Sequence, residues 1–220
     1  MPGRKGTSHQ PDEGSSLSHE RELVELASAG NQRAIGALYD IYVVPLYRFC
    51  LSKLSNETDA EDLTEEIFLK AITSIEKFTW RATKRKRDDE SSEFNPFRAW
   101  LFRIARNQII STYRKKDTRS RVDVHYADEP VWIADQAAGP AELTERKFLL
   151  EQATAAIAQL PESQRDVIQL RFMGDMNVNE VAALLGKEPG NVRVLQHKAL
   201  KNLRTILAGE FDLQGVESQR

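Results

Sequence analysis

The sequence has little of what enzymes, metal sites and membrane proteins need. Its 220 residues contain one cysteine, Cys50, so a disulfide framework and a cysteine metal site are both excluded. No signal peptide and no 18-residue apolar run occurs, so we expect a cytoplasmic chain without a membrane partner. No phosphate-binding glycine-rich loop is present, and no metal-ligand spacing relates the four histidines, His9, His19, His125 and His197. We therefore expect no enzyme activity, no metal and no cofactor.

Charge is segregated along the chain, although the net charge is only −2. Residues 81–121 carry thirteen Lys and Arg against five Asp and Glu, whereas residues 122–151 carry two against seven. Residues 57–66 contain six acids and no base. A polyanion responds to such local fields rather than to the average, so the net charge does not exclude a nucleic-acid partner.

Apolar residues recur with helical period outside the polar stretches, and no alternating strand pattern or repeat is present. The sequence therefore predicts an all-α protein of two small helical domains. A polar, charged loop interrupts the first domain at 79–95. The expected order is a disordered tail, the first domain, a flexible linker, the second domain and a short tail, at residues 1–19, 20–116, 117–140, 141–208 and 209–220.

Local signals predict the helices of the first domain. Pro45 is expected to kink or end the first of them, whose buried face is predicted to hold Ala34, Leu38, Ile41 and Tyr42. Thr58 to Glu61 form a capping-box pattern. This pattern is expected to open a helix with core residues Leu63, Ile67, Phe68, Ala71, Ile72, Ile75 and Phe78.

A further amphipathic helix is predicted from the Asn95-Pro96 start to about Lys116. Its core side is expected to hold Phe97, Trp100, Leu101, Ile104 and Ala105. Its other side groups polar residues that suit single-stranded nucleic acid, namely Arg103, Arg106, Asn107, Arg114 and Lys115. The nearby aromatic side chains can stack on bases or pack in the core, and the sequence leaves both interpretations open for Trp100, Phe102 and Tyr113.

Residues 160–208 contain a short helix, a three-residue turn and a long helix. Asn177 and Glu180 form a capping box for the short helix, and Gly186 supplies a left-handed stop. Pro189 suits the first position of the long helix, because its missing N–H is not needed there. This layout is typical of a helix-turn-helix, whose second helix enters the DNA major groove.

The long helix has two faces at 100° per residue. An apolar stripe holds Val192, Leu195, Ala199, Leu203 and Ile206, and a mostly cationic face holds Gly190, Arg193, His197, Lys201 and Arg204. A merely solvated charged face has the same pattern in isolation. The capped helix that precedes it favours DNA binding.

Three segments, in this order, resemble bacterial RNA polymerase sigma factors of the extracytoplasmic-function (ECF) group. They are DAEDLTEEIFLKAITSIEKF (59–78), FRAWLFRIARNQIISTYRKK (97–116) and LPESQRDVIQLRF followed by EVAALLGKEPGNVRVLQHKALKNLR (within 160–208). The resemblance covers about residues 20–208, and the order of the motifs makes it specific. It implies a protein without catalytic activity that binds core RNA polymerase and directs promoter-specific initiation.

The resemblance also implies a division of labour. The first domain would dock on the clamp of the polymerase β′ subunit through Asp59, Glu61, Asp62 and Glu65. The helix with Arg103, Arg106, Asn107, Arg114 and Lys115 would face the melted −10 element of promoter DNA. The second domain would bind the flap of the β subunit and read the −35 duplex through Pro189, Gly190, Asn191, Arg193, His197 and Lys201. Many relatives are held inactive by an anti-sigma protein, but nothing in the sequence identifies one.

The chain departs from the family pattern in three places. Its loop at 79–95 is longer than usual, so the residue that captures a flipped −10 base is not identified. Glu188 stands where the recognition helix usually has a Ser or Thr cap, which implies a weaker cap or a shifted start. Leu195 stands where many members carry a basic residue, which leaves the base contacts open.

Two other functions fit parts of the sequence. A stand-alone helix-turn-helix regulator would explain residues 160–208 but not the separate first domain, and it would bind its operator without polymerase. A nucleic-acid enzyme such as a recombinase is disfavoured, because no cluster of Ser, Tyr or carboxylate side chains demands a catalytic role. A DNA nicking or joining assay distinguishes this second alternative.

Overall fold

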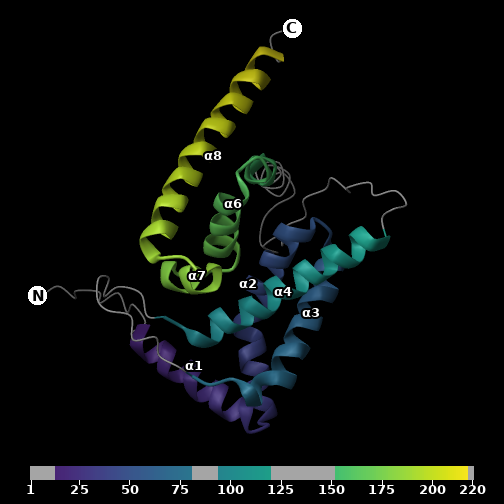
Figure 1. Ribbon diagram of the computed structural model, residues 1–220, viewed down its shortest axis with the longest axis vertical. Helices are drawn as coiled ribbons and strands as arrows, with labels where there is room; N and C mark the ends of the chain where they lie inside the picture. Colours follow the sequence, from purple (N-terminus) through teal and green to yellow (C-terminus); the bar gives the residue numbers. More distant parts are fainter. Residues whose placement is uncertain (1–12, 81–93, 120–151, 218–220) are drawn as a thin grey trace, which may run out of the picture.

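The computed structural model describes residues 13–80, 94–119 and 152–217, and at 13–15, 115–119 and 210–217 it places the backbone alone. Within these ranges every regular element is a helix, which confirms the all-α prediction (Figure 1). The stretch 120–140, and residues 81–93 of the polar loop, lie outside the described residues. In chain order the elements are α1 (Glu13–Ser28), α2 (Gln32–Leu54), α3 (Glu57–Ser74), the 3-10 turn η1 (Ile75–Lys77), α4 (Pro96–Arg119), a helical stretch at 152–158, α6 (Glu162–Ile168), the π-helical turn η2 (Gln169–Met173), α7 (Val178–Leu185) and α8 (Pro189–Glu217).

α2 is the central helix of the N-terminal domain, which comprises α1 to α4. By length and composition alone, this helix is apolar enough to cross a membrane. Its packing gives another reason for that composition, because α1, α3 and α4 all pack against it. Leu46, Phe49 and Cys50 are fully buried there. An apolar core helix of this kind is weak evidence for a membrane span.

The boundaries of α2 differ from the expectation in two respects. The helix continues through Pro45 to Leu54, so Pro45 does not end it. The ring removes only the hydrogen bond that would reach the carbonyl of Ile41. Ile41 is 40% exposed and is not part of the buried face, since it lies at the edge of a stripe that continues through Leu46. The other residues predicted for this face are buried: Ala34, Leu38 and Tyr42.

The N-cap of α3 lies two residues before the predicted cap, Thr58. Asn56 is the N-cap, and its Oδ1 accepts a hydrogen bond from the backbone nitrogen of Asp59 at 2.9 Å. The Thr58 cap was therefore wrong, because Ser55 in the left-handed conformation ends α2 and leaves Asn56 placed to cap the next helix. The predicted core positions hold, with Ile72 and Phe78 half-buried and the others buried, namely Leu63, Ile67, Phe68, Ala71 and Ile75.

The C-terminal domain, residues 152–217, contains the predicted helix-turn-helix. Asn177 and Glu180 form the capping box of α7, and Gly186 ends that helix at φ 64°. α8 begins at Pro189, as predicted, but it continues to Glu217 rather than ending near residue 208. That extension contains two glycines, Gly209 and Gly215, and each costs about 1 kcal/mol, too little to stop a long helix.

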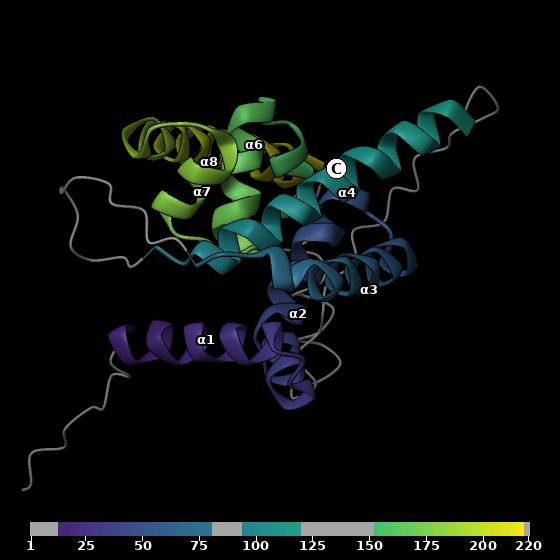
Figure 2. The same ribbon diagram turned by 60° about the horizontal axis from the view of Figure 1, so that its bottom comes forward.

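The two domains pack against each other instead of standing apart. In both views α4 lies between the C-terminal domain and α3 (Figure 1, Figure 2). α4 packs on α7, and α2 packs on η2. Apolar residues of the C-terminal domain thereby join the core of the N-terminal domain, including Val167, Leu170, Met176 and Val181. A smaller cluster around Leu160, Ile168 and Ala199 holds α6 to α8.

Candidate nucleic-acid interface

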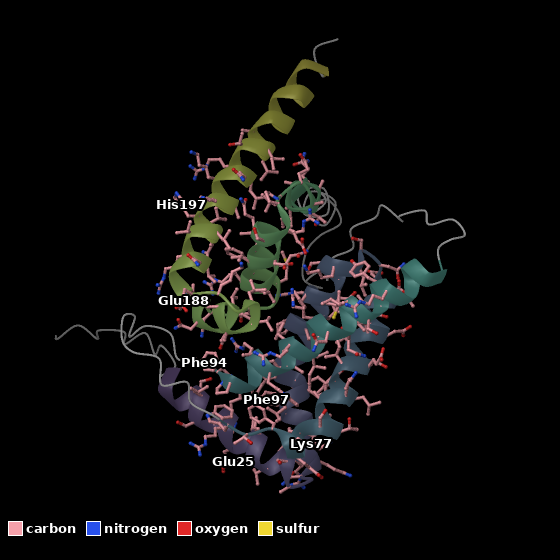
Figure 3. All side chains as sticks on the ribbon, in the orientation of Figure 1. Glu25, Lys77, Phe94, Phe97, Glu188 and His197 are labelled. Carbon is pink, nitrogen blue, oxygen red and sulfur yellow. The ribbon has the colours of Figure 1, made fainter. Side chains whose placement is uncertain are left out.

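α8 presents the predicted DNA-reading residues to solvent. Val192 and Ala199, on the opposite stripe, are fully buried. His197 lies along the side of α8 that faces away from α6 (Figure 3). Pro189 is half-buried at the start of the helix, and the other predicted residues are exposed, namely Gly190, Asn191, Arg193, His197 and Lys201. The helix therefore has an exposed, mostly cationic face opposite a buried one.

The structure explains two departures from the family pattern. The carbonyl of Glu188 accepts a hydrogen bond from the backbone nitrogen of Val192 at 3.2 Å, so α8 starts where predicted and Glu188 occupies the cap position. Leu195 is half-buried and packs against the core. A leucine at this position therefore supports the fold and does not interrupt the cationic face.

Val194 is a residue that the sequence reasoning missed. It is 53% exposed and lies on the same side of α8 as Arg193 and His197. The helical pattern assigned apolar residues to the core, so an apolar residue on the cationic face was overlooked. Its angular position on the helix could have indicated its exposure, because Val194 lies between Gly190 and Lys198 on the helical wheel. A methyl-bearing side chain there can contact the C5-methyl group of thymine.

α4 brings the second set of polar residues together. Arg103, Arg106, Asn107 and Arg114 are exposed, whereas the side chain of Lys115 lies outside the described residues. Arg103 also donates from Nη2 to the carbonyl of Ala183 in α7, at 3.4 Å. The face is therefore open to solvent along most of its length and is touched by the C-terminal domain at Arg103.

The aromatic residues of α4 divide between the two interpretations. Phe102 is fully buried, so its stacking on bases is ruled out and core packing is confirmed. Trp100 is half-buried and lies with its ring centroid 5.1 Å from that of Phe78. Tyr113 is exposed at its ring, while its hydroxyl donates to the carbonyl of Lys53. Trp80 also packs on Phe78, so an aromatic cluster flanks the loop at 79–95.

α3 carries the predicted docking face. Glu61, Asp62 and Glu65 are exposed, and Asp59 is half-buried in the first turn. Leu69 lies on the same stripe one turn beyond Glu65 and is 66% exposed, the highest value among the exposed large apolar residues of the described ranges. Sequence periodicity missed Leu69 because it falls outside the buried stripe of α3. A single exposed apolar residue is ordinary on a protein surface, so Leu69 is of interest only because it continues the acidic stripe of α3.

Two observations concern the thiol and the possible metal ligands of the described residues. Burial raises the pKa of the Cys50 thiol to about 12, so this thiol stays protonated. No group of three His, Cys, Asp or Glu side chains in the described ranges is arranged to hold a metal ion.

Two family models match the chain. The model for Sigma-70 region 2 matches residues 38–119, and the model for Sigma-70, region 4 matches residues 156–205. The chain is similar to the ECF RNA polymerase sigma factor BldN of Streptomyces coelicolor, with 32% identity over 198 residues that cover 90% of this chain and 69% of BldN. It is an ECF RNA polymerase sigma factor. The ECF sigma factor SigX of Bacillus subtilis is 30% identical and covers 76% of this sigma factor and 80% of its own length.

A solved structure shares the fold of this sigma factor. CnrH, in complex with the cytosolic domain of CnrY, is 26% identical with a TM-score of 0.58, over 86% of this chain and 97% of CnrH. Region 2 corresponds to most of the N-terminal domain and region 4 to most of the C-terminal domain. As a sigma factor the protein is not an enzyme; it binds core RNA polymerase and promoter DNA and directs promoter-specific transcription initiation.

Proposed function

We propose that three exposed faces of this sigma factor divide the work of initiation. α3 docks on the clamp of the polymerase β′ subunit, α4 faces the melted −10 element, and α8 reads the −35 duplex while the C-terminal domain contacts the flap of the β subunit. The main support for this proposal is the face of α8, because its cations are exposed opposite the fully buried Val192 and Ala199. A helix so anchored can enter a major groove without disturbing its own packing.

Arg193 is the strongest candidate for base readout on α8. It is exposed in the second turn of the helix, the part of a recognition helix that contacts base edges. A bidentate contact from Arg to guanine contributes about 1–3 kcal/mol of discrimination. His197 and Lys201 follow on the same face one and two turns later, where they support phosphate or base contacts.

α4 suits a single strand rather than a duplex. Arg106 and Asn107 are exposed side by side in the middle of the helix, and helix-dipole compensation explains cations only in a last turn. The aromatic cluster of Phe78, Trp80 and Trp100 lies at the start of the same helix. Cations for phosphates beside aromatic rings for bases are the combination found at single-strand sites.

Separate templates test this division. Arg193→Ala should weaken transcription from duplex promoters that carry a −35 element, and it should leave transcription from a pre-melted template without that element unchanged. Arg106→Ala should impair open-complex formation on the duplex and also reduce transcription from the pre-melted template. Equal failure of both variants on the pre-melted template would contradict the division.

We also propose that this sigma factor acts in the cytoplasm and is held inactive by an anti-sigma protein. The support is the similarity to CnrH, whose structure was solved with the cytosolic domain of CnrY. Copurification of the full-length chain from its native cells tests the proposal. Recovery of core polymerase alone, under all growth conditions, would count against an anti-sigma partner.

A further inference from the structure

The amide of Gln108, on the buried side of α4, is held between two charged side chains of α3. Its Oε1 accepts a hydrogen bond from Lys70 Nζ at 2.8 Å, and its Nε2 donates to Oε1 of Glu66 at 2.7 Å. Glu66 and Lys70 are four residues apart, so they lie one turn from each other on the same side of α3. Gln108 is 9% exposed, and it joins α3 to α4 inside the N-terminal domain.

The two charges fix the orientation of this amide. Its carbonyl oxygen suits the Lys70 ammonium, which can only donate, and its NH₂ group suits the Glu66 carboxylate, which only accepts. Turning the amide over would bring the NH₂ group against the ammonium and the carbonyl oxygen against the carboxylate. Hydrogen bonds to charged groups are also stronger than those between neutral groups. Gln108 therefore has one favourable arrangement between Glu66 and Lys70.

Much of the contact between α3 and α4, which lie side by side in both views (Figure 1, Figure 2), is apolar. Ile67 and Ala71 of α3 and Leu101 and Ala105 of α4 are buried in one core cluster. Apolar burial is non-directional, so it tolerates a small rotation or shift of one helix on the other. A hydrogen bond instead weakens steeply when its angle closes. The hydrogen bonds of Gln108 therefore specify the rotation and register of α4 on α3.

Gln108 and Glu66 each follow a residue of a proposed functional face directly in the sequence. Arg106 and Asn107, immediately before Gln108, are exposed on the polar face of α4. Glu65, immediately before Glu66, is exposed on the docking face of α3. A rotation of α4 on α3 would therefore move Arg106 and Asn107 relative to any partner bound to α3.

We propose that Gln108 is a positioning residue for promoter opening. It makes no contact with DNA itself. Together with Glu66 and Lys70, it holds α4 at the rotation that presents Arg106 and Asn107 to the −10 strand while α3 is docked on polymerase. The inference rests on the proposed roles of α3 and α4. Its consequence is that loss of the Gln108 hydrogen bonds slows promoter opening without weakening the binding of core polymerase.

Three variants of the full-length protein test this role. Gln108→Met has a flexible, unbranched side chain without charge, and it removes both hydrogen bonds. Gln108→Glu keeps an acceptor for Lys70 but places a second carboxylate against Glu66. The double variant, Gln108→Glu with Glu66→Gln, restores both hydrogen bonds, because the new glutamine can donate to the new glutamate. Met, Glu and Gln all have good helix propensity, so α3 and α4 should be retained.

Promoter opening is measured with core polymerase on a duplex promoter, as the permanganate reactivity of unpaired thymines over time. Gln108→Met and Gln108→Glu should open the promoter about tenfold more slowly, since small misplacements of an aligned group are costly. Their Kd for core polymerase should equal that of the wild type. The double variant should recover the wild-type opening rate, which a general loss of packing would not allow.

Two comparisons separate the hydrogen bonds from the effect of charge. Gln32→Glu adds the same charge at an exposed position of α2, so it is the matched control and should change neither the opening rate nor the Kd. Gln108→Met is neutral, so an effect due only to repulsion between the new carboxylate and DNA would leave this variant with the wild-type opening rate.

Three results overturn the proposal: wild-type opening by Gln108→Met, an equal loss of opening and of core binding in that variant, or no recovery in the double variant. If Gln108→Glu does not fold, Gln108→Met decides the first two. Failure of the proposed role of α4 is recognised separately, because Arg106→Ala would then open promoters at the wild-type rate.

Discussion

Lys53 Nζ lies 2.6 Å from Asp166 Oδ1, although the two residues are 113 positions apart in the sequence. Lys53 is near the end of α2 in the N-terminal domain and Asp166 is in α6 of the C-terminal domain. Both side chains are less than one-fifth exposed, so this ion pair is better shielded than a surface pair. It joins the domains at a point separate from the hydrogen bond between Asn95 and Glu180.

Asp166→Asn should destabilise the protein, because it leaves the largely buried Lys53 ammonium without its counter-charge. We expect a loss of about 1–2 kcal/mol, between the values for exposed and fully buried pairs. Chemical denaturation of the free protein measures this loss. Glu162→Gln removes an exposed acid from the same helix and should have little effect. Equal losses in the two variants would show that helix charge, not the ion pair, was responsible.

The α3 face should govern affinity for core polymerase. Asp62→Lys with Glu65→Lys is expected to abolish copurification with core polymerase while leaving helicity intact. Leu69→Ser keeps the charge and removes an exposed apolar contact, so it should raise the Kd by about tenfold, as loss of a modest interface contact does. Glu22→Lys, a charge reversal at an exposed position of α1, is the control. Unchanged copurification of the double variant would remove this face from the docking surface.

Val194 should read a methyl group in the −35 element. If its side chain packs on thymine, replacing the relevant thymine by uracil removes the contact and should weaken binding by the polymerase complex by about 1 kcal/mol. Val194→Ala should weaken binding similarly on the thymine duplex, and it should then be insensitive to uracil. Competition binding with singly substituted duplexes measures both effects. Independent, additive losses from the protein and DNA changes would show that the two groups do not touch.

The packing of the two domains should depend on pH through Glu180, whose Oε1 accepts a hydrogen bond from the backbone nitrogen of Asn95 at 3.1 Å. Burial raises the pKa of this carboxyl above its usual value, against the opposing effects of Arg98 and the two backbone N–H groups. A proton therefore binds the folded protein more readily than the unfolded chain, in which the carboxyl is hydrated. The folded protein is stabilised as the pH falls through the raised pKa, and that stabilisation is lost as the pH rises through it.

The free energy of unfolding, measured from just below to well above the ordinary Glu pKa of about 4.3, follows this dependence. Glu180→Gln should lose this dependence, while the other titratable and charged groups nearby, Glu20, Tyr42 and Arg98, are left in place. The difference between the two titrations therefore isolates Glu180. Superimposable titrations would assign the pH response to another group.

Much of each domain could be predicted from sequence because its signals are local. The capping box of Asn177 and Glu180, the stop at Gly186 and the two faces of α8 depend on residues within one or two turns. The start of α3 was misplaced because Thr58 and Asn56 both have capping chemistry. The turn at Ser55 decides which of them is the cap. The sequence contains no pattern that predicts the positive φ of Ser55.

The contact between the domains could not be predicted in the same way. As a capping-box residue, Glu180 has a sufficient local explanation, and nothing near it indicates a second hydrogen bond to a residue 85 positions away. In the sequence, Arg98 similarly has the position expected of a cation on the surface of a helix. Leu69 and Val194 were missed for the opposite reason, because helical periodicity sorts apolar residues into the core and does not mark those that remain outside for a partner.

The central claim is that α8 reads the −35 element and α4 faces the −10 element. The most direct test is transcription of a genomic promoter library by core polymerase with either the wild-type protein or Arg193→Ala. Start sites are read by sequencing. The wild-type protein should define two sequence blocks, near −10 and −35. Arg193→Ala should relax one or two positions of the −35 block and leave the −10 block unchanged. A changed −10 block with an intact −35 block would contradict the assignment of α8.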